Sequence, residues 1–240
     1  NATGPAMAGF NIPPEVLANH LFSGGEEEAA LPYLKQSAER AKKMSAYREA
    51  RKYWEQGDAT IVQESTGRLE RANIDVDLNL GRIYSNQGEL DAATERYKKA
   101  FKAAKVRGDE RSQGDALMAL GAVLRSRNQW DGALKLFEQS RLLYERNGDK
   151  KGIAAVNNYM GSIAYWRGQW KEARDNYERS LAIYTELQEA VEVASMTSNL
   201  GGVAYAIGDD LSAIEYFKRS AEGHRQTNNV IGIAEVDANL

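Results

Sequence analysis

The stretch from Asn79 to Ala100, NLGRIYSNQGELDAATERYKKA, returns along the chain with a step of forty residues. Its Leu80–Gly81 pair has counterparts at Leu120–Gly121, Met160–Gly161 and Leu200–Gly201. Three further positions keep the same step: Ala93, Ala133, Ala173 and Ala213; Tyr97, Phe137, Tyr177 and Phe217; and Ala100, Ser140, Ser180 and Ser220. A fixed period of about 20–50 residues is the signature of a protein built from stacked structural repeats.

Within each unit the apolar residues have helical spacing, as in Leu120, Val123 and Leu124. Each unit is therefore predicted to form two amphipathic helices. Turn residues separate the two helices at Gly88, Asn128, Gly168 and Gly208, and separate the units at Gly108–Asp109, Gly148–Asp149 and Asn228–Asn229. Gly or Asn suits the left-handed end of a helix, and a following Asp or Asn can cap the next one. Only Gln188–Glu189 departs from this chemistry.

The small residues of the repeat predict close contact between the two helices of a unit. We expect Gly121 to face Ala133, so that no side chain holds the two helix axes apart. The ring of Phe137 would then wedge against the neighbouring unit.

These residues together resemble a tetratricopeptide repeat. The Leu–Gly pair, the apolar residue two positions after the Gly, the Gly at seven, the Ala at twelve and the aromatic at sixteen all match in the stretch 79–100, and several of these positions repeat four times in register. The forty-residue length is similar to the long-helix variety of kinesin light chains, Pins-type regulators and the sensor arms of bacterial signalling ATPases and transcription activators. The resemblance implies an all-α fold, a right-handed superhelix (α-solenoid) of tandem helical hairpins.

The predicted organisation has three parts. Residues 1–12 are predicted to be a tag remnant or linker, and residues 13–66 are predicted to form divergent helices similar to the repeat, near 13–23, 26–43 and 46–64. Residues 67–240 form four units and a truncated fifth first helix, in one continuous solenoid. The segment 13–66 also resembles the region that joins the core of bacterial regulatory ATPases to their repeat arm.

The chain stops at a repeat position. Leu240 is the fifth member of the series that contains Leu80 and Leu200, and Ile233 and Val236 continue the buried stripe of a first helix. We therefore expect the natural protein to continue with Gly and further repeats. The truncated helix is expected to cover the helix that contains Phe217.

Composition narrows the function classes. The net charge of −3 offers no general attraction to nucleic acid, and the absence of cysteine excludes thiol chemistry. No apolar run approaches the roughly 18 residues that span a bilayer. The two histidines, His20 and His224, have no partners at metal-ligand spacing. The chain is predicted to be cytoplasmic, without cofactor or metal, and not an enzyme.

One face of the first helix in each unit lies opposite the buried stripe, and the resemblance implies that it lines a concave groove. The candidate partner-binding residues on or beside this face are Arg82, Arg125, Asn158, Ser162, Tyr165, Trp166, Asn199 and Tyr205. Tyr165, Trp166 and Tyr205 have no core position in the repeat, so they are either partner contacts or cover for the groove wall.

The asparagines and arginines have two interpretations each. Asn158 and Asn199 resemble groove amides that hold a bound peptide backbone, since one amide offers a donor and an acceptor. The alternative is a hydrogen bond to the adjacent repeat. Arg82 and Arg125 either pair with an acidic ligand or belong to a solvated face.

The sequence favours a non-catalytic scaffold that holds a peptide segment or protein partner in the groove. The alternative is the effector-sensing arm of a larger regulator, which binds a small molecule or its own other domains. An enzymatic role would need a cleft with converging titratable groups. Self-association through an open end of the repeat stack is a further prediction.

Overall fold

A computed structural model describes residues 12–44, 46–63 and 70–237. Among these residues there are twelve helices and no strand, so the all-α repeat fold is confirmed. The chain divides into two compact units, residues 1–103 and 104–240, with the boundary inside α5. The predicted continuity of the stack through residues 64–69 lies outside the described residues and stays a prediction.

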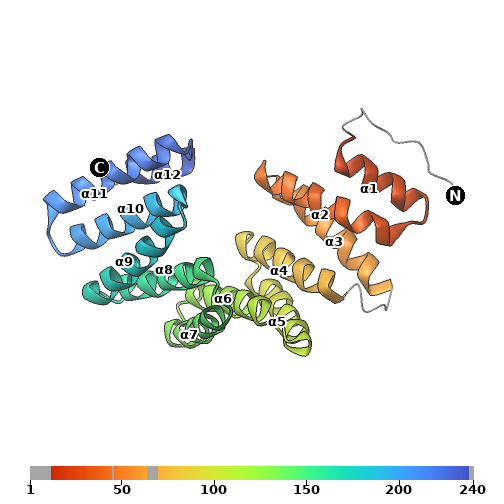
Figure 1. Ribbon diagram of the computed structural model, residues 1–240, viewed down its shortest axis with the longest axis horizontal. Coiled ribbons are helices and arrows are strands. Elements are labelled where there is room, and N and C mark those ends of the chain that lie inside the picture. The colour runs from red at the N-terminus through yellow and green to blue at the C-terminus, as the bar shows by residue number, and fades with distance from the viewer. Residues whose placement is uncertain (1–11, 45, 64–69, 238–240) are drawn as a thin grey trace. The chain divides into compact units, whose positions relative to one another are not determined.

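The first unit is formed by α1 to α4 and most of α5. These helices are α1 (Pro14–Ser23), α2 (Glu27–Lys43), α3 (Tyr47–Gln63), α4 (Glu70–Asn86) and α5 (Leu90–Arg107). The first three begin and end within one residue of the predicted ranges. Consecutive helices from α1 to α4 pack against each other (Figure 1). Their assignment as divergent repeats stays a prediction, and residues 1–11 of the predicted linker are not described.

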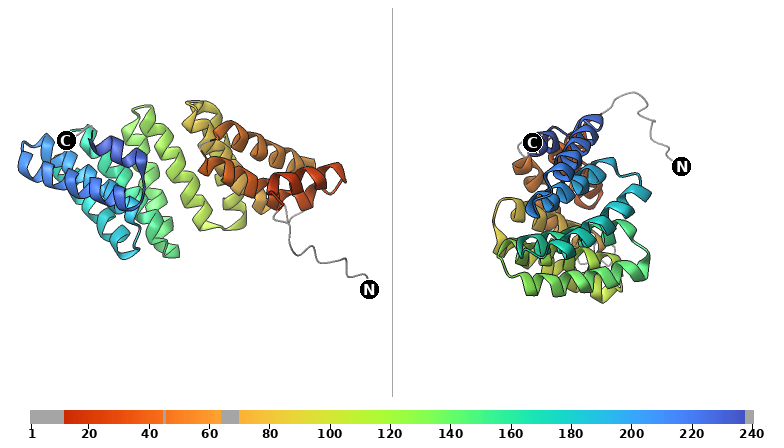
Figure 2. Two further views of the ribbon diagram at one scale, coloured as in Figure 1. Left: turned by 90° about the horizontal axis from the view of Figure 1, so that it is seen from above. Right: turned by 90° about the vertical axis from the view of Figure 1, so that its left-hand side faces the viewer.

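The second unit contains three helical hairpins and one additional helix. Its helices are α6 (Glu110–Ser126), α7 (Trp130–Asn147), α8 (Lys150–Trp166), α9 (Trp170–Glu186), α10 (Ala190–Ala206), α11 (Asp210–Gln226) and α12 (Val230–Asp237). Each hairpin packs against the next, and α12 packs against α11 (Figures 1 and 2). The side chain of Val236 in α12 lies in the same apolar cluster as Phe217, as expected of a covering helix. Leu240 lies outside the described residues.

The turns between helices follow the predicted chemistry. Gly148 ends α7 with φ of 71°, and Asn128 and Asn228 also have positive φ. The next helix is capped by Asp149, whose Oδ1 accepts a hydrogen bond of 2.9 Å from the backbone nitrogen of Gly152. At the exceptional pair, Gln188 still adopts a positive φ of 57°. The repeat therefore imposes the turn geometry even where its favoured residues are missing.

The packing of the repeated glycines adds a contact that the sequence did not predict. Gly121 faces the ring of Phe137 in its own hairpin, because a Cβ atom on Gly121 would lie 2.6 Å from Phe137 Cε1. The other three forty-residue repeats show the same contact, at Gly81–Tyr97, Gly161–Tyr177 and Gly201–Phe217. Glycine is required because the ring fills the space of its missing side chain. The predicted contact of Phe137 with the neighbouring repeat is present, since its ring stacks on Tyr159 of the next repeat with the ring centroids 5.1 Å apart.

Small residues at the end of each unit tie the hairpin together. Ser140 Oγ donates to the carbonyl oxygen of Gly114 at 2.8 Å, and Ser180 and Ser220 make the equivalent bonds to Ala154 and Ala194. All three serines are fully buried. A buried hydroxyl without such an acceptor would cost about 1–3 kcal/mol. Each bond therefore fixes how the second helix lies against the first.

Candidate functional site

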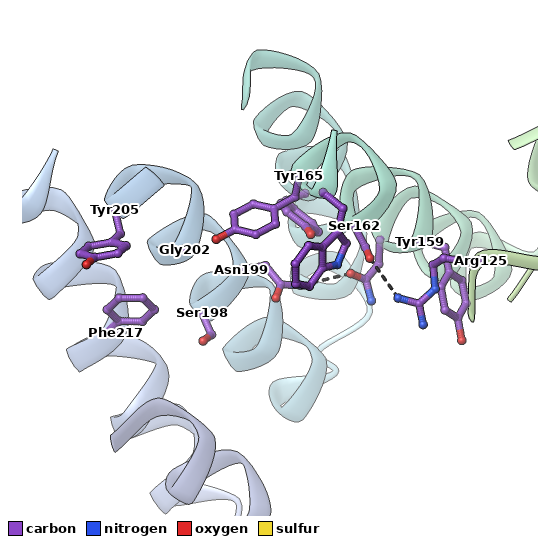
Figure 3. Close-up of a pocket in the computed structure, with 12 residues that line it drawn as sticks. Arg125, Tyr159, Ser162, Tyr165, Ser198, Asn199, Gly202, Tyr205 and Phe217 are labelled. Carbon is purple, nitrogen blue, oxygen red and sulfur yellow. Dashed lines mark hydrogen bonds between the residues drawn. The ribbon is translucent and has the colours of Figure 1, made fainter. Parts of the chain in front are cut away.

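The second unit contains a cavity of about 850 Å³ on the face formed by the first helices of its hairpins. We call it the α8–α10 cavity, after the helices that supply most of its walls (Figure 3). Its lining residues are Arg125, Asn158, Tyr159, Ser162, Tyr165, Trp166, Tyr177, Ser198, Asn199, Gly202, Tyr205 and Phe217. The volume is within the range of about 300–1,000 Å³ that small-molecule sites occupy.

Seven of the eight candidate residues from the sequence line this one cavity: Arg125, Asn158, Ser162, Tyr165, Trp166, Asn199 and Tyr205. They come together because their positions recur on one face of α6, α8 and α10, and the hairpins stack in register. Arg82 belongs to the first unit and does not line the cavity. Its guanidinium lies 3.8 Å from Glu39 Oε1 and donates to Asn79 Oδ1. Whether Arg82 belongs to a solvated face or pairs with an acidic ligand stays a prediction.

Two asparagines join α8 to α10 at the cavity wall. Asn199 Nδ2 donates a hydrogen bond of 3.1 Å to Asn158 Oδ1, shown by a dashed line in Figure 3. The alternative interpretation of these residues, a bond between adjacent repeats, is therefore present in the structure. The bond uses only the oxygen of the Asn158 amide and only the nitrogen of the Asn199 amide. Within the described residues, Asn158 Nδ2 and Asn199 Oδ1 keep a donor and an acceptor for another molecule.

Arg125, near the end of α6, supplies the positive charge of the cavity. Its Nη1 donates to Ser162 Oγ at 3.1 Å, and its guanidinium carbon lies 5.3 Å from the centre of the Tyr159 ring. Of the residues that line the cavity in the described part of the chain, Arg125 alone has a charged side chain. A bound molecule would therefore meet a positive electrostatic potential at this end.

The aromatic side chains of the cavity fall into two groups. Trp166 and Tyr205 are 69% and 68% exposed. The ring of Tyr165 contacts Trp166 and Trp170 edge to face, with ring centroids 5.9 and 5.4 Å apart. These rings offer apolar area to a ligand at the open side. Tyr177 and Phe217 are buried among the residues that line the cavity. Burial raises the pKa of the Tyr177 hydroxyl well above its usual value, so this phenol stays neutral.

Tyr159 is a cavity residue that sequence reasoning missed. It occupies the repeat position where Asn79 and Asn199 carry amides, one residue after Asn158. Its ring stacks on Phe137 and lies under Arg125, so it connects the packed interior to the cavity wall. An aromatic residue at a position that holds Asn in other units was the signal that could have identified it.

Metal clusters and membrane-spanning helices are absent from the described residues. No group of three or more His, Asp or Glu side chains there could hold a metal ion. No described helix is long and apolar enough to cross a membrane. The α8–α10 cavity is therefore the site on which the functional argument rests.

The fold and the cavity define a helical-repeat protein with a ligand-sized recess on the face of its first helices. A family model for the tetratricopeptide repeat matches residues 70–146 and 152–226, more than half of the chain. The chain therefore belongs to the tetratricopeptide repeat family. No curated protein sequence matches it.

Solved structures share the fold at low sequence identity. BtubC (BKLC) from P. vanneervenii has a TM-score of 0.70 at 20% identity over 90% of this chain and 88% of its own. A Rap protein complexed with competence and sporulation factor has a TM-score of 0.79 at 14% identity, over 94% of this chain and 62% of its own. The Rap conjugation gene regulator of the plasmid pLS20, in complex with the Phr* peptide, has a TM-score of 0.78 at 15% identity, over 90% and 59%. The chain thus spans about three fifths of the length of these two Rap proteins.

Proposed function

We propose that this chain is a protein-interaction module that binds an extended peptide segment in the α8–α10 cavity. The observation that carries the proposal is the Asn158–Asn199 pair, which presents one donor and one acceptor at the junction of two repeats. A peptide unit offers the complementary acceptor and donor, whatever its side chains are. Arg125 lies on one side of this pair and the exposed ring of Tyr205 on the other (Figure 3).

Two structural relatives with bound partners support binding as the function, and one of these partners is a peptide. The Rap conjugation gene regulator is in complex with the Phr* peptide, and another Rap protein is complexed with competence and sporulation factor. Their identity to this chain is too low to transfer particular contacts, so the contacts proposed here come from this chain's own cavity. Arg82 stays a separate proposed contact in the first unit, for a partner that also reaches that unit.

The proposed role is binding without catalysis. None of the described residues that line the cavity is Asp, Glu, His or Lys, so the cavity brings no acid–base pair together. The chemistry present consists of amide, hydroxyl, aromatic and guanidinium groups, which bind and orient a ligand.

The test removes two of the aromatic rings that line the cavity. The double variant Tyr165→Ala/Trp166→Ala should lose binding of peptides that the wild type selects from a random pool, while its far-UV circular dichroism stays helical. Leu211→Ala is the control, because Leu211 is 85% exposed in the same unit and does not line the cavity. Unchanged peptide binding by the double variant would refute the assignment of this cavity.

A second candidate function is the sensing of a small molecule by the arm of a larger regulator. It is favoured by the cavity volume of about 850 Å³, which is large enough for such an effector. A screen of the wild type against both peptides and a small-molecule library distinguishes the two functions, and the same double variant shows whether the captured molecules bind in this cavity. Selective capture of small molecules, with no peptide retained, would favour the sensing arm.

A further inference from the structure

Gly57 is a buried glycine inside α3 that helix packing does not require. Every other buried glycine within the described helices has a ring atom 2.5–2.9 Å from the place where its Cβ atom would lie. A Cβ atom on Gly57 would meet Leu31 Cδ2 at 3.8 Å and Val76 Cγ2 at 3.9 Å, which are ordinary van der Waals distances. Because glycine is less favourable than alanine inside a helix, the missing side chain has another consequence to explain it.

The later repeats carry a Cβ atom at the position of Gly57. Gly57 follows the buried ring of Trp54 by three residues. The equivalent residues, three positions after the aromatic residue of each forty-residue repeat, are Ala100, Ser140, Ser180 and Ser220. All four are fully buried, so their side chains fill space in their hairpins. The hairpin of α2 and α3 leaves the corresponding space empty.

That space belongs to a cavity of about 270 Å³ inside the first unit, which we call the Gly57 cavity. It is lined by residues of α2, α3 and α4 (Figure 1). Its apolar walls are formed by Leu31, Pro32, Leu34, Tyr53, Trp54 and Val76. An apolar cavity of about 150 Å³ in a protein interior stays dry and binds benzene, so this larger one has room for a fused two-ring molecule.

Two charged side chains line the Gly57 cavity in the described structure, and they neutralise each other. Lys35 Nζ donates to Asp75 Oδ2 at 2.5 Å, and the two side chains are 53% and 49% exposed, so the pair lies on the solvent side. An ionised ligand would lose its hydration without gaining a counter-charge from this pair. The cavity is therefore suited to an uncharged ligand.

We infer that the Gly57 cavity binds a small, uncharged aromatic molecule. Its apolar walls remove the ligand from water, and the rings of Tyr53 and Trp54 offer edge-to-face or offset contacts. An aromatic side chain of a protein partner would bring its peptide groups to a wall that includes Pro32, which has no N–H donor. A free molecule avoids that cost. This site lies in the first unit and does not depend on the proposed function.

Indole is the probe, titrated into the full chain while NMR records the methyl resonances of Leu34 and Val76. N-acetyltryptophanamide is the comparison, because it carries the same ring on two peptide groups. The wild type should bind indole with a Kd below about 1 mM, and N-acetyltryptophanamide about tenfold or more weakly.

Substitutions at Gly57 fill the cavity from its wall. Gly57→Met should raise the Kd for indole about tenfold or more, because its flexible side chain occupies the ligand's space, and Gly57→Ala about twofold. Neither should lower the urea midpoint of unfolding, since a Cβ atom fits at this position. Gly202→Ala is the matched control: Gly202 is a helical glycine that lines the α8–α10 cavity, so this variant should keep the wild-type indole affinity at the Leu34 and Val76 methyl groups.

The absence of methyl shifts with indole would overturn the site. Equal or tighter binding of N-acetyltryptophanamide would overturn the assignment to a small molecule and favour the side chain of a protein partner. Unchanged indole affinity in the Gly57 variants would show that the ligand does not occupy this cavity. If Gly57→Met does not fold, Gly57→Ala decides alone, because its one added carbon meets no close contact.

Discussion

Asn199 in α10 donates a hydrogen bond of 3.1 Å to Asn158 in α8, although the two asparagines occupy different positions of the forty-residue repeat. They are 41 residues apart, so the pair follows from the stagger between adjacent hairpins and not from equivalence in the repeat. The bond satisfies the Nδ2 donor of Asn199 and the Oδ1 acceptor of Asn158 without a ligand. It also fixes the orientation of both amides toward the cavity that they line.

The Asn158–Asn199 bond should appear as energetic coupling between the two residues. Asn158→Ala and Asn199→Ala should each lower the free energy of unfolding by about 0.5–1.5 kcal/mol, and the double variant by less than the sum. Urea unfolding followed by circular dichroism measures this cycle. Asn79→Ala is the control, because Asn79 Nδ2 donates to the Asp75 carbonyl of its own helix. Its effect should add to that of Asn158→Ala, and additivity of the Asn158 and Asn199 variants as well would contradict the coupling.

The contact of Gly121 with Phe137 predicts that a single methyl group is costly at that position. The Cβ atom of Gly121→Ala would lie 2.6 Å from a ring that is fully buried and stacked on Tyr159. We expect a loss of about 1–3 kcal/mol from overpacking, measured by urea unfolding.

Gly202→Ala is the matched control for this change. Gly202 is also inside a helix, but its Cβ atom would meet Tyr165 at 3.8 Å, an ordinary van der Waals distance. Because alanine favours a helix over glycine by about 1 kcal/mol, this variant should be as stable as the wild type or more stable. Similar losses in the two variants would show that ring contact is not the reason for Gly121.

The repeat made the helices predictable because its residues act locally. Gly148 and Asp149 end one helix and cap the next through their own backbone and side chain, so their effect can be inferred from two neighbouring letters. The contact of Gly121 with Phe137 was not predicted, since the position of a ring depends on its rotamer and on the distance between two helix axes. Sequence periodicity specifies neither.

The residues of the cavity were also predictable from the sequence, whereas the contacts between them were not. The helical period placed Asn158, Ser162 and Tyr165 on one face, and the structure shows all three lining one recess. The bond from Arg125 to Ser162 joins residues 37 positions apart and depends on how α6 packs against α8. Such contacts between repeats need the stagger of the hairpins, which the sequence of one unit does not contain. Whether these residues bind a partner stays a prediction.

Asp115 predicts a dependence of stability on pH. Burial raises the pKa of its carboxyl group above the usual value, although the Tyr144 hydroxyl donates to it at 2.7 Å and acts in the opposite direction. The folded state therefore holds this proton more tightly than the unfolded state. The stability contributed by Asp115 should fall as the pH rises from the ordinary pKa of aspartate through the raised one.

The variant Asp115→Asn isolates this contribution, because its amide oxygen still accepts from Tyr144 but does not ionise. The free energy of unfolding of the variant should increase relative to that of wild type, so that the variant becomes relatively more stable, between about pH 4, near the ordinary aspartate pKa, and pH 7. Urea unfolding at both pH values gives the comparison. A difference that is the same at both would mean that Asp115 does not titrate in this range.

The two kinds of turn between repeats predict unequal costs of mutation. Asp149 Oδ1 accepts from the Gly152 backbone nitrogen at 2.9 Å, whereas Glu189 at the equivalent position makes no side-chain cap bond in the described structure. Asp149→Ala should therefore lower the free energy of unfolding by about 1 kcal/mol, and Glu189→Ala by no more than about 0.5 kcal/mol. Urea unfolding followed by circular dichroism measures both.

Asp149 also lies 3.0 Å from the Arg111 guanidinium, so a loss in Asp149→Ala has two sources. Asp149→Asn separates them, because asparagine caps a helix as well as aspartate does but carries no charge. The ion pair involves an exposed arginine and is worth little, so Asp149→Asn should keep most of the wild-type stability. If Asp149→Asn were as unstable as Asp149→Ala, the ion pair and not the cap would hold this turn, and the repeated Asp would have an electrostatic role between units.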